Sequence, residues 1–264
     1  MGSVAISLKN FKVSNQGFTL EIPTLELNKG KSIAICGANG SGKTTLLLAL
    51  AGFVSFEGTY RLLERDFREL KRDELARLIA YLPQESRLSL GFDVFYTVLT
   101  GRYPLTRGRG YRKEDELATN RLLKRLDLLK FKDRSFLNLS GGEKKRVLLA
   151  RTLNKEAPIV LLDEPFSELD LFYKMEFLKI FEEFKRSQGT TFVCVIHEVE
   201  LALSYFDLVL YLQNGKVKIL KPPHLIEEKE LSCVNSIKVK LFKIRNYEPF
   251  AFYLPVPDKK FDSA

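Results

Sequence analysis

Eight residues near the start of the chain combine three glycines, a lysine and a threonine at a spacing that suits a phosphate group. They read Gly37-Ala-Asn-Gly-Ser-Gly-Lys-Thr44. The glycines let backbone N–H groups approach phosphate oxygens where a side chain would collide, while Lys43 reaches the β- and γ-phosphates and Thr44 offers its hydroxyl to Mg²⁺. The segment predicts a loop that binds a nucleoside polyphosphate. The residues expected to contact the nucleotide are Gly37, Asn39, Gly40, Ser41, Gly42, Lys43, Thr44 and Thr45.

Two adjacent acids farther along the chain could hold a metal ion and activate water. Asp163 and Glu164 follow the apolar run Ile159-Val-Leu-Leu162, which predicts a buried strand. Both acids would then emerge at the carboxyl end of that strand, where open α/β sheets bind ligands. We expect Asp163 to hold Mg²⁺ and Glu164 to polarise a water for attack on the γ-phosphate. Two acids after a strand more often begin a loop or a helix, but the phosphate loop upstream favours the catalytic interpretation.

A third motif, Leu139-Ser-Gly-Gly-Glu143, offers a hydroxyl and two flexible backbone amides at a helix N-terminus, which together form a second anion clamp. With this motif the chain resembles the ATP-binding-cassette (ABC) ATPases over nearly all of Val4–Leu220. The resemblance implies that the turn Ser140-Gly141-Gly142 of one protomer contacts the γ-phosphate held by the Gly37–Thr44 loop of a second copy. ATP and Mg²⁺ are then the expected cofactors, and the expected assembly is a homodimer with ATP sandwiched between the copies.

Three more positions match the same family in order. Gln84 resembles the Q-loop glutamine, Ser167-Glu-Leu-Asp170 resembles the D-loop, and His197 resembles the switch histidine that contacts the γ-phosphate. Outside such a series, a Gln after a proline is usually a turn residue and a His after a strand is usually structural. The resemblance implies catalytic roles for Glu164, His197 and Gln84, and Mg²⁺ ligation by Thr44, Gln84 and Asp163.

Strands and helices must alternate in a definite order to hold these motifs together. Apolar runs predict strands at Val4–Val13, Phe18–Ile22, Lys31–Cys36, Phe56–Leu63, Ile79–Leu82, Ile159–Leu162, Thr190–Ile196, Asp207–Leu212 and Lys216–Leu220. Helices are expected at Lys43–Leu50, Gly142–Leu153, Asp170–Arg186 and Glu198–Tyr205. This order predicts an α/β fold. The family resemblance then implies an ABC ATPase nucleotide-binding domain: a parallel P-loop core, an antiparallel β subdomain and an inserted helical subdomain.

The helical pattern from Phe92 to Phe131 interrupts the alternation, with leucines at 117, 122, 126 and 129 separated by charges. We therefore expect a helical subdomain over about 85–153, inserted into an ATPase domain that spans 1–220. After Pro222-Pro223, a polar helix and two strands at Ile237–Ile244 and Pro249–Leu254 predict a C-terminal α/β extension over 221–264.

Composition excludes several other classes of protein. The chain has 264 residues, of which 45% are hydrophobic, as in a globular protein. No apolar run approaches the roughly 18 residues that span a bilayer, and the first residues lack the layout of a secretory signal. Three cysteines without metal-like spacing fit reduced thiols in the cytoplasm. The net charge of +9, with clusters at Arg102–Lys113 and Lys144–Arg146, predicts a solvated basic surface or a basic face near phospholipid headgroups. We expect no nucleic acid partner.

A few positions depart from the usual family pattern. The family commonly has an aromatic residue that stacks on adenine, but alignment from the phosphate loop puts that place near Ser14–Asn15, where no aromatic stands. Phe11 or Phe18 could substitute. Lys145 stands where Gln is common, and Phe166 stands where Thr is frequent. Neither change touches an expected phosphate contact.

The segment Val98-Leu-Thr-Gly-Arg-Tyr-Pro104 resembles part of the importer ATPases for iron–siderophores, haem and vitamin B12, where it borders the groove for the membrane subunit's coupling helix. Without that resemblance, Gly101 and Pro104 would indicate an ordinary helix end. The resemblance implies an ATP-hydrolysing importer subunit at the cytoplasmic face of the membrane, with separate polytopic permease subunits and, indirectly, a substrate-binding protein. The alternatives are the ATPase of another ABC transporter, with a different cargo or an exporter, and a soluble ABC ATPase outside transport.

Overall fold

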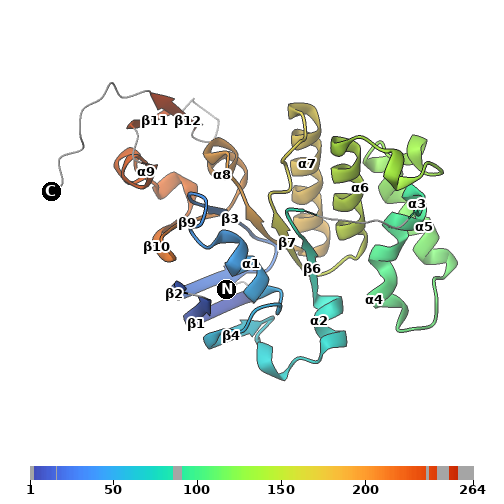
Figure 1. Ribbon diagram of the computed structural model, residues 1–264, viewed down its shortest axis with the longest axis horizontal. Helices are drawn as coiled ribbons and strands as arrows, with labels where there is room; N and C mark the ends of the chain where they lie inside the picture. The colour runs from blue at the N-terminus through green and yellow to red at the C-terminus, as the bar shows by residue number, and fades with distance from the viewer. Residues whose placement is uncertain (1–2, 16, 86–90, 236–237, 243–249, 255–264) are drawn as a thin grey trace.

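One twisted sheet carries the phosphate loop and the two acids at the ends of two of its strands (Figure 1). The computed structural model describes residues 3–15, 17–85, 91–235, 238–242 and 250–254. Within these ranges the main sheet has 10 strands. In order across the sheet they are β5 (Arg65–Asp66), β4 (Glu57–Leu62), β1 (Val4–Asn15), β2 (Phe18–Asn28), β10 (Lys216–Lys221), β9 (Leu208–Gln213), β3 (Ser32–Cys36), β8 (Thr191–Val195), β7 (Ile159–Asp163) and β6 (Ile79–Leu82).

The strands β9, β3, β8, β7 and β6 run parallel to one another. Every residue of β3, β7 and β8 is buried. Because both faces of these strands are covered, their sequences are continuous apolar runs rather than alternating ones. The predicted buried strands are confirmed, with ends that differ by a residue or so. Parallel strands bring their carboxyl ends to one edge of the sheet, so the loop after β3 and the acids at the end of β7 meet there.

The other strand pairs are mostly antiparallel, as expected for the β subdomain. Strands β1 and β2 form a long hairpin, and β2 continues to Asn28, beyond the predicted end at Ile22. Pro23 is tolerated because it is skipped in the pairing with β1: Ile22 pairs with Phe11, and Thr24 pairs with Lys9. Its missing N–H therefore costs no ladder bond. Strand β10 joins the two halves of the sheet, antiparallel to β9 and parallel to β2.

Helices cover both faces of the sheet, and each face has its own apolar core. On one face, Ile33 and Ile35 of β3 belong to a core shared with α1 (Lys43–Leu50). On the other face, Ala34 and Cys36 belong to a larger core. The helices of that second core include α6 (Gly141–Asn154), α7 (Leu171–Gln188) and α8 (Val199–Tyr205). The alternation of β3 side chains between the two cores follows from the two-residue period of a strand. All four helices predicted for the core are confirmed.

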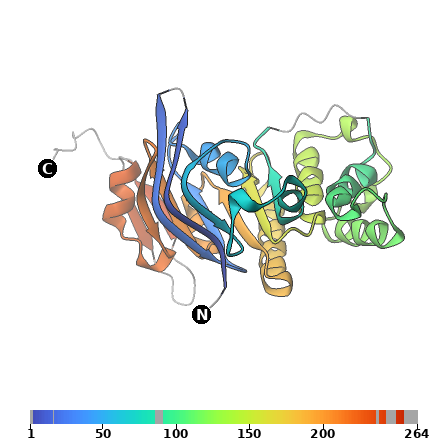
Figure 2. The same ribbon diagram turned by 90° about the horizontal axis from the view of Figure 1, so that it is seen from below.

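A group of helices forms a lobe at one end of the molecule, on the right in Figures 1 and 2. Its helices are α3 (Val94–Leu99), α4 (Tyr103–Thr106), α5 (Lys113–Arg125) and α6, while the short α2 (Arg72–Leu78) leads into β6. The predicted helical interruption is thus confirmed. The leucine stripe is only partly right. Leu117 is 50% exposed, because α5 buries Ala118 and Leu122 instead, and the helix ends before Leu126 and Leu129.

Three cations of the predicted basic surface are in fact buried. Arg102 is 9% exposed, and its guanidinium donates to Asp115 at 2.7 Å and to Glu156 at 2.8 Å. Lys145 and Arg146 in α6 are 7% and 5% exposed. The expectation of a solvated position is wrong for these three side chains. Arg102 is buried because it pairs with two acids, and Lys145 and Arg146 are buried by the packing of α6.

Beyond β10 the chain forms α9 (Glu228–Asn235) and a separate antiparallel pair, β11 (Lys238–Phe242) and β12 (Phe250–Leu254), at the end of the molecule away from the helical lobe (Figure 1). This confirms the helix and the two strands. The predicted strand ends at Ile237, Ile244 and Pro249 lie outside the described residues, as does the Pro255–Pro257 tail. None of the helices in the described segments combines the length and apolar character that crossing a bilayer requires.

Candidate active site

The phosphate loop connects the end of β3 to the start of α1, and its glycines are required by the backbone itself. Gly37 has a φ of 144°, and a Cβ there would lie 2.2 Å from the carbonyl oxygen of Leu212 in β9. Gly40 has a φ of 76° and faces open space, while Gly42 caps α1 with a φ of 105°. Side chains are disfavoured in these left-handed conformations. The glycines of the motif therefore shape the loop and leave room beside it.

Lys43 lies within this loop and is 6% exposed. Its ammonium donates to the carbonyl oxygens of Gly37 at 2.8 Å and of Ala38 at 2.9 Å. Burial lowers the pKa of Lys43, and the carboxylates of Glu164 and Asp163 oppose that shift. The lysine thus sits between the loop backbone and the two acids, as a residue that binds phosphates requires.

Asp163 is completely buried at the end of β7, yet neither of its carboxylate oxygens has a hydrogen-bond partner of good geometry. Burial raises the pKa of Asp163, and the nearby Thr44 hydroxyl lowers it in part. The hydroxyl of Ser41 is likewise buried without a partner. A buried carboxylate is costly unless it is paired or binds a metal, and oxygen ligands suit Mg²⁺. Asp163, with Thr44 beside it, therefore fits the expected metal.

Glu164 follows directly in a left-handed conformation, with a φ of 49°. Its Oε1 lies 2.6 Å from Nε2 of His197, which follows β8, the strand next to β7. Its carbonyl oxygen accepts a hydrogen bond from the Ser167 hydroxyl at 2.9 Å. Two adjacent strands thus bring together an acid and a histidine that lie 33 residues apart in the sequence. This pair can hold and orient a water molecule.

A cavity of about 610 Å³, called the P-loop cavity below, collects most of the predicted nucleotide contacts. It is lined by Asn15, Phe18, Asn39, Gly40, Gly42, Lys43, Thr44, Thr45, Gln84 and Glu164. His197 lines an adjoining hollow of about 150 Å³ together with Glu164 and Ser167. The turn Ser140-Gly141-Gly142 lines neither, so the structure brings the predicted residues together in two groups rather than one.

The signature turn forms the start of α6. The Ser140 hydroxyl accepts from the backbone N–H of Glu143 at 3.3 Å, and the Glu143 carboxylate accepts from the N–H of Ser140 at 2.8 Å. This capping box fixes the start of the helix. Gly141 and Gly142 face the D-loop of the same chain: a Cβ on Gly141 would lie 2.7 Å from a carboxylate oxygen of Glu168.

The two aromatic candidates for adenine stacking have different positions. Phe18, at the start of β2, lines the P-loop cavity beside Asn15. Phe11 is 1% exposed and stacks on Phe56 at 5.0 Å between ring centroids. The suggestion of Phe11 is therefore wrong, because its ring belongs to the core of the β subdomain. The tip of the β1–β2 hairpin thus offers the ring of Phe18 from β2, whereas the alignment indicated a position near Ser14–Asn15 in β1.

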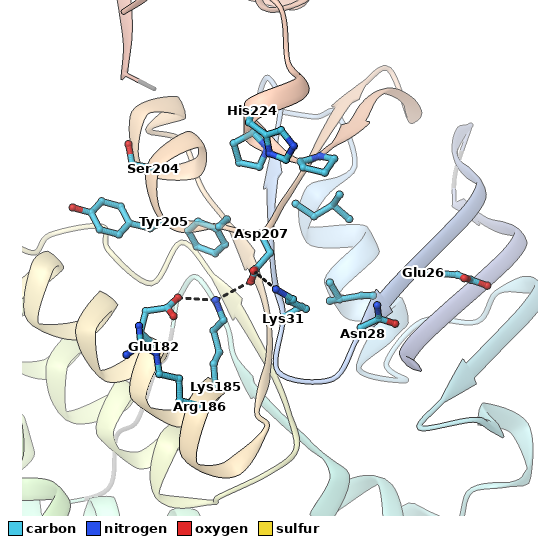
Figure 3. Close-up of a pocket in the computed structure, with 15 residues that line it drawn as sticks. Glu26, Asn28, Lys31, Glu182, Lys185, Arg186, Ser204, Tyr205, Asp207 and His224 are labelled. Atoms are coloured by element: carbon cyan, nitrogen blue, oxygen red, sulfur yellow. Dashed lines mark hydrogen bonds and ion pairs between the residues drawn. The ribbon is translucent and has the colours of Figure 1, made fainter. Parts of the chain in front are cut away.

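A second cavity, of about 650 Å³, lies at the opposite edge of the parallel strands, before β3 and β9 begin (Figure 3). Lys31 and Lys185 both pair there with Asp207, at 2.9 and 2.8 Å, and Glu182 pairs with Lys185. Burial raises the pKa of Asp207, but its hydrogen bonds to the two lysines outweigh that and bring it to about 2. This charged cluster is satisfied within itself and contains none of the motif residues.

Comparison with known proteins agrees with this geometry. The family model described as ABC transporter matches residues 20–167, which include the phosphate loop, the signature turn and both acids. The chain belongs to the ABC transporter family of ATP-binding proteins. It is accordingly an ATP-binding enzyme that hydrolyses ATP.

Curated relatives cover most of this cassette. A hemin import ATP-binding protein of Shewanella denitrificans is 38% identical over 80% of this chain and 85% of its own length. A probable siderophore transport system ATP-binding protein of Bacillus subtilis is 34% identical over 82% of this chain and 80% of its own length. A cobalamin import ATP-binding protein of Halobacterium salinarum is 34% identical over 72% of this chain, but that match spans 48% of the relative.

Solved structures confirm the predicted fold class. A chain described as a metal-chelate type ABC transporter in an inward-facing conformation superposes with a TM-score of 0.80 at 24% identity, covering 97% of this chain and 98% of that one. An ATP-binding cassette in a dimeric post-hydrolysis state with ADP and Pi gives a TM-score of 0.71 at 25% identity, covering 83% and 98%.

One functional candidate escaped the sequence reasoning. Lys145 is buried in α6 and donates a long hydrogen bond of 3.4 Å to the carbonyl oxygen of Gln84. Burial lowers its pKa, and the carboxylates of Glu168, Glu164 and Asp163 oppose that shift. The one signal in the sequence was its departure from the Gln that is common at this position.

Proposed function

We propose that the chain is the ATP-hydrolysing subunit of an importer for an iron–siderophore, haem or cobalamin-type substrate. It would act at the cytoplasmic face of the membrane, with separate polytopic permease subunits and, indirectly, a substrate-binding protein. The names of the relatives support this class of cargo. The observation that carries the proposal is a groove formed where the Gly101–Pro104 segment meets the core.

This docking groove has a volume of about 370 Å³. It is lined by Ala80, Tyr81, Thr100, Gly101, Tyr103, Pro104, Tyr111, Arg151, Thr152 and Lys155. A Cβ on Gly101 would lie 2.1 Å from the carbonyl oxygen of Arg151, so glycine is required for the segment to lie against α6. Tyr103 is 63% exposed. A groove that combines an exposed tyrosine ring with polar and basic side chains suits an amphipathic helix.

Two basic side chains at the end of α6 and just beyond it add a charge preference to the docking groove. The guanidinium of Arg151 donates to the Thr100 hydroxyl at 2.8 Å. Burial, with a smaller contribution from Arg151, lowers the pKa of Lys155 to about 8. An acidic side chain or the C-terminal end of a permease helix would complement these cations.

Within the proposed site, each residue has a distinct task in hydrolysis. Lys43 and the loop backbone would hold the β- and γ-phosphates, and Phe18 would stack on the adenine. Asp163, Thr44 and Gln84 would hold Mg²⁺, which supplies positive charge to the phosphate oxygens. Glu164 would accept the proton of a water that attacks the γ-phosphorus as the bond to ADP breaks, and His197 would orient that water.

A second copy of the chain would complete the site. The signature turn Ser140-Gly141-Gly142 lies outside the P-loop cavity of its own chain, which supports its use across a dimer. Next to the D-loop, Leu171 and Phe172 are 69% and 66% exposed at the start of α7. Exposed apolar residues beside a functional turn indicate a surface that a partner covers. ATP between the two copies would draw them together, because it binds the closed pair better than the open one.

The proposal is tested by purifying the tagged chain from detergent-solubilised native membranes and identifying the proteins that accompany it. We expect a polytopic membrane protein in the wild-type sample. The variant Tyr103→Glu should lose most of it, since it replaces the exposed ring on the rim of the docking groove with a charge. Leu225→Glu is the matched control, because Leu225 is 55% exposed and does not line the groove.

Uptake of labelled haem, ferric siderophore and cobalamin by cells that lack the chain then identifies the cargo. Loss of uptake of one of these supports the importer assignment. Recovery of soluble partners alone, with uptake of all three unchanged, would show that the chain serves a different process.

A further inference from the structure

A buried lysine connects the signature helix to the catalytic acids. Lys145 is 7% exposed and lies on α6, one turn after the signature glycines. Burying an ammonium group is unfavourable unless nearby groups compensate. Neither the phosphate contacts nor the hydrolysis step uses this residue, so its position requires a separate explanation.

The surroundings of Lys145 come from three loops that meet at the active site. Its Nζ lies 3.4 Å from the carbonyl oxygen of Gln84 in the Q-loop. The acids whose charges act on it are Glu168 in the D-loop, then Glu164 and Asp163 at the end of β7. The same two acids also act on Lys43 from the side of the phosphate loop. The acid pair therefore interacts with the charges of two lysines, Lys43 in the phosphate loop and Lys145 in α6.

We propose that Lys145 is a positioning residue: its fixed positive charge holds the Q-loop against the signature helix and partly neutralises the acids that bind the metal. This inference rests on the proposed assignment of Asp163 and Gln84 as metal ligands. A divalent cation at Asp163 is repelled by Lys145, so metal binding weakens the hold of Lys145 on the acids.

The charge of Lys145 can be removed with little change in shape. Lys145→Gln keeps much of the side chain and a hydrogen-bond donor, whereas Lys145→Arg keeps the charge. Lys144→Gln is the matched control, because it removes the same charge from the adjacent, half-buried position on α6. Circular dichroism melting establishes that each variant is folded, and Lys145→Met supplies the same comparison if the glutamine variant does not fold.

The readout is the affinity for Mn²⁺, measured by electron paramagnetic resonance in the presence of a non-hydrolysable ATP analogue. Removing a cation near the acids should tighten Mn²⁺ binding roughly three- to ten-fold in Lys145→Gln. Lys145→Arg and Lys144→Gln should both bind like the wild type. Amide hydrogen exchange over residues 82–85 should also become faster in Lys145→Gln alone, because the Q-loop loses its link to α6.

An Mn²⁺ affinity of Lys145→Gln that equals that of Lys144→Gln, or falls below it, overturns the proposal. Mn²⁺ binding by the wild-type chain shows whether the role of Lys145 or the proposed metal site is at fault. If wild type binds no Mn²⁺ with nucleotide, the metal assignment is wrong and the role of Lys145 falls with it. If wild type binds Mn²⁺ and all variants match it, only the role of Lys145 is wrong.

Discussion

The carboxylate of Glu164 lies 2.6 Å from His197, and the proposed mechanism assigns this pair to the attacking water. If Glu164 accepts the proton of the attacking water, Glu164→Gln should bind ATP normally but hydrolyse it about 100- to 10,000-fold more slowly. Because ATP then persists between the copies, the variant should also accumulate as a dimer. Phosphate release and size-exclusion chromatography with light scattering measure the two effects.

The matched control for this change is Glu57→Gln, an exposed glutamate on β4. It should hydrolyse ATP at the wild-type rate and show no ATP-dependent dimer beyond that of the wild type. A Glu164→Gln variant with wild-type turnover would remove Glu164 from the proposed role.

Among the described residues that line the P-loop cavity, the aromatic one is Phe18, and its replacement tests the adenine contact. Stacking of a base on an aromatic ring contributes roughly 1–3 kcal/mol, so Phe18→Leu should weaken ATP binding about 5- to 100-fold. The turnover number at saturating ATP should change little, because the ring is far from the γ-phosphate in this role. Calorimetric titration and a separate determination of KM and kcat distinguish these effects.

Phe53→Leu provides the comparison for Phe18, since Phe53 is 66% exposed and does not line the cavity. Equal ATP affinities for the two variants would mean that adenine is held elsewhere.

At the scale of residues, the sequence predicted where the phosphate loop and the two acids stand in the fold, because a strand precedes each and their residue types are dictated by chemistry. It could not choose between Phe11 and Phe18, because that choice depends on which face of the hairpin each ring occupies. It also assigned Lys145 and Arg146 to the surface, since a run of cations normally lies in water. Only the packing of α6 against the Q-loop and α7 shows otherwise.

At the scale of elements, the Asp207 cluster joins α7 to the start of β3 and β9 and should stabilise the fold in a pH-dependent way. The folded-state pKa of about 2 lies below the ordinary value of 3.8. The lowered pKa therefore contributes roughly 2 kcal/mol at neutral pH. That contribution is complete above about pH 5 and is lost as the pH falls towards 2.

Asp207→Asn should therefore unfold at lower urea concentration than the wild type at pH 7, and the difference should shrink as the pH falls from about 5 towards 3. Asp133→Asn, whose side chain is 85% exposed, should match the wild type throughout. A difference that stays constant over this pH range would contradict the assigned role of the carboxylate.

The sequence indicated the ends of elements best where side chains near the end define them. It missed ends that depend on how one strand pairs with another. Helix α7 begins after Asp170, whose side chain accepts from the N–H of Tyr173, and it ends at Gln188, two residues beyond the predicted Arg186, with Gly189 as a left-handed C-cap. Such signals are visible in a sequence. The extension of β2 through Pro23 is not, because it depends on the register with β1. The exposure of Leu117 similarly depends on which face of α5 meets its neighbours.

At the scale of the whole molecule, the proposed nucleotide site is divided between two surfaces of one chain. The P-loop cavity gathers the phosphate loop, Gln84 and Glu164, while the signature turn stands apart beside Glu168. Within one chain the signature turn does not line the P-loop cavity. Two copies related by a twofold axis can bring both surfaces to one ATP, since each supplies what the other lacks.

Mixing two inactive variants measures this division most directly. Lys43→Ala should lose the phosphate contact, and Ser140→Arg should block the signature turn, so each should hydrolyse little ATP alone. In an equal mixture, half of randomly paired dimers combine the two variants, and each such dimer has one intact site. Turnover should therefore return to about a quarter of the wild-type value. A mixture no more active than the two variants measured separately would contradict a nucleotide site shared between copies.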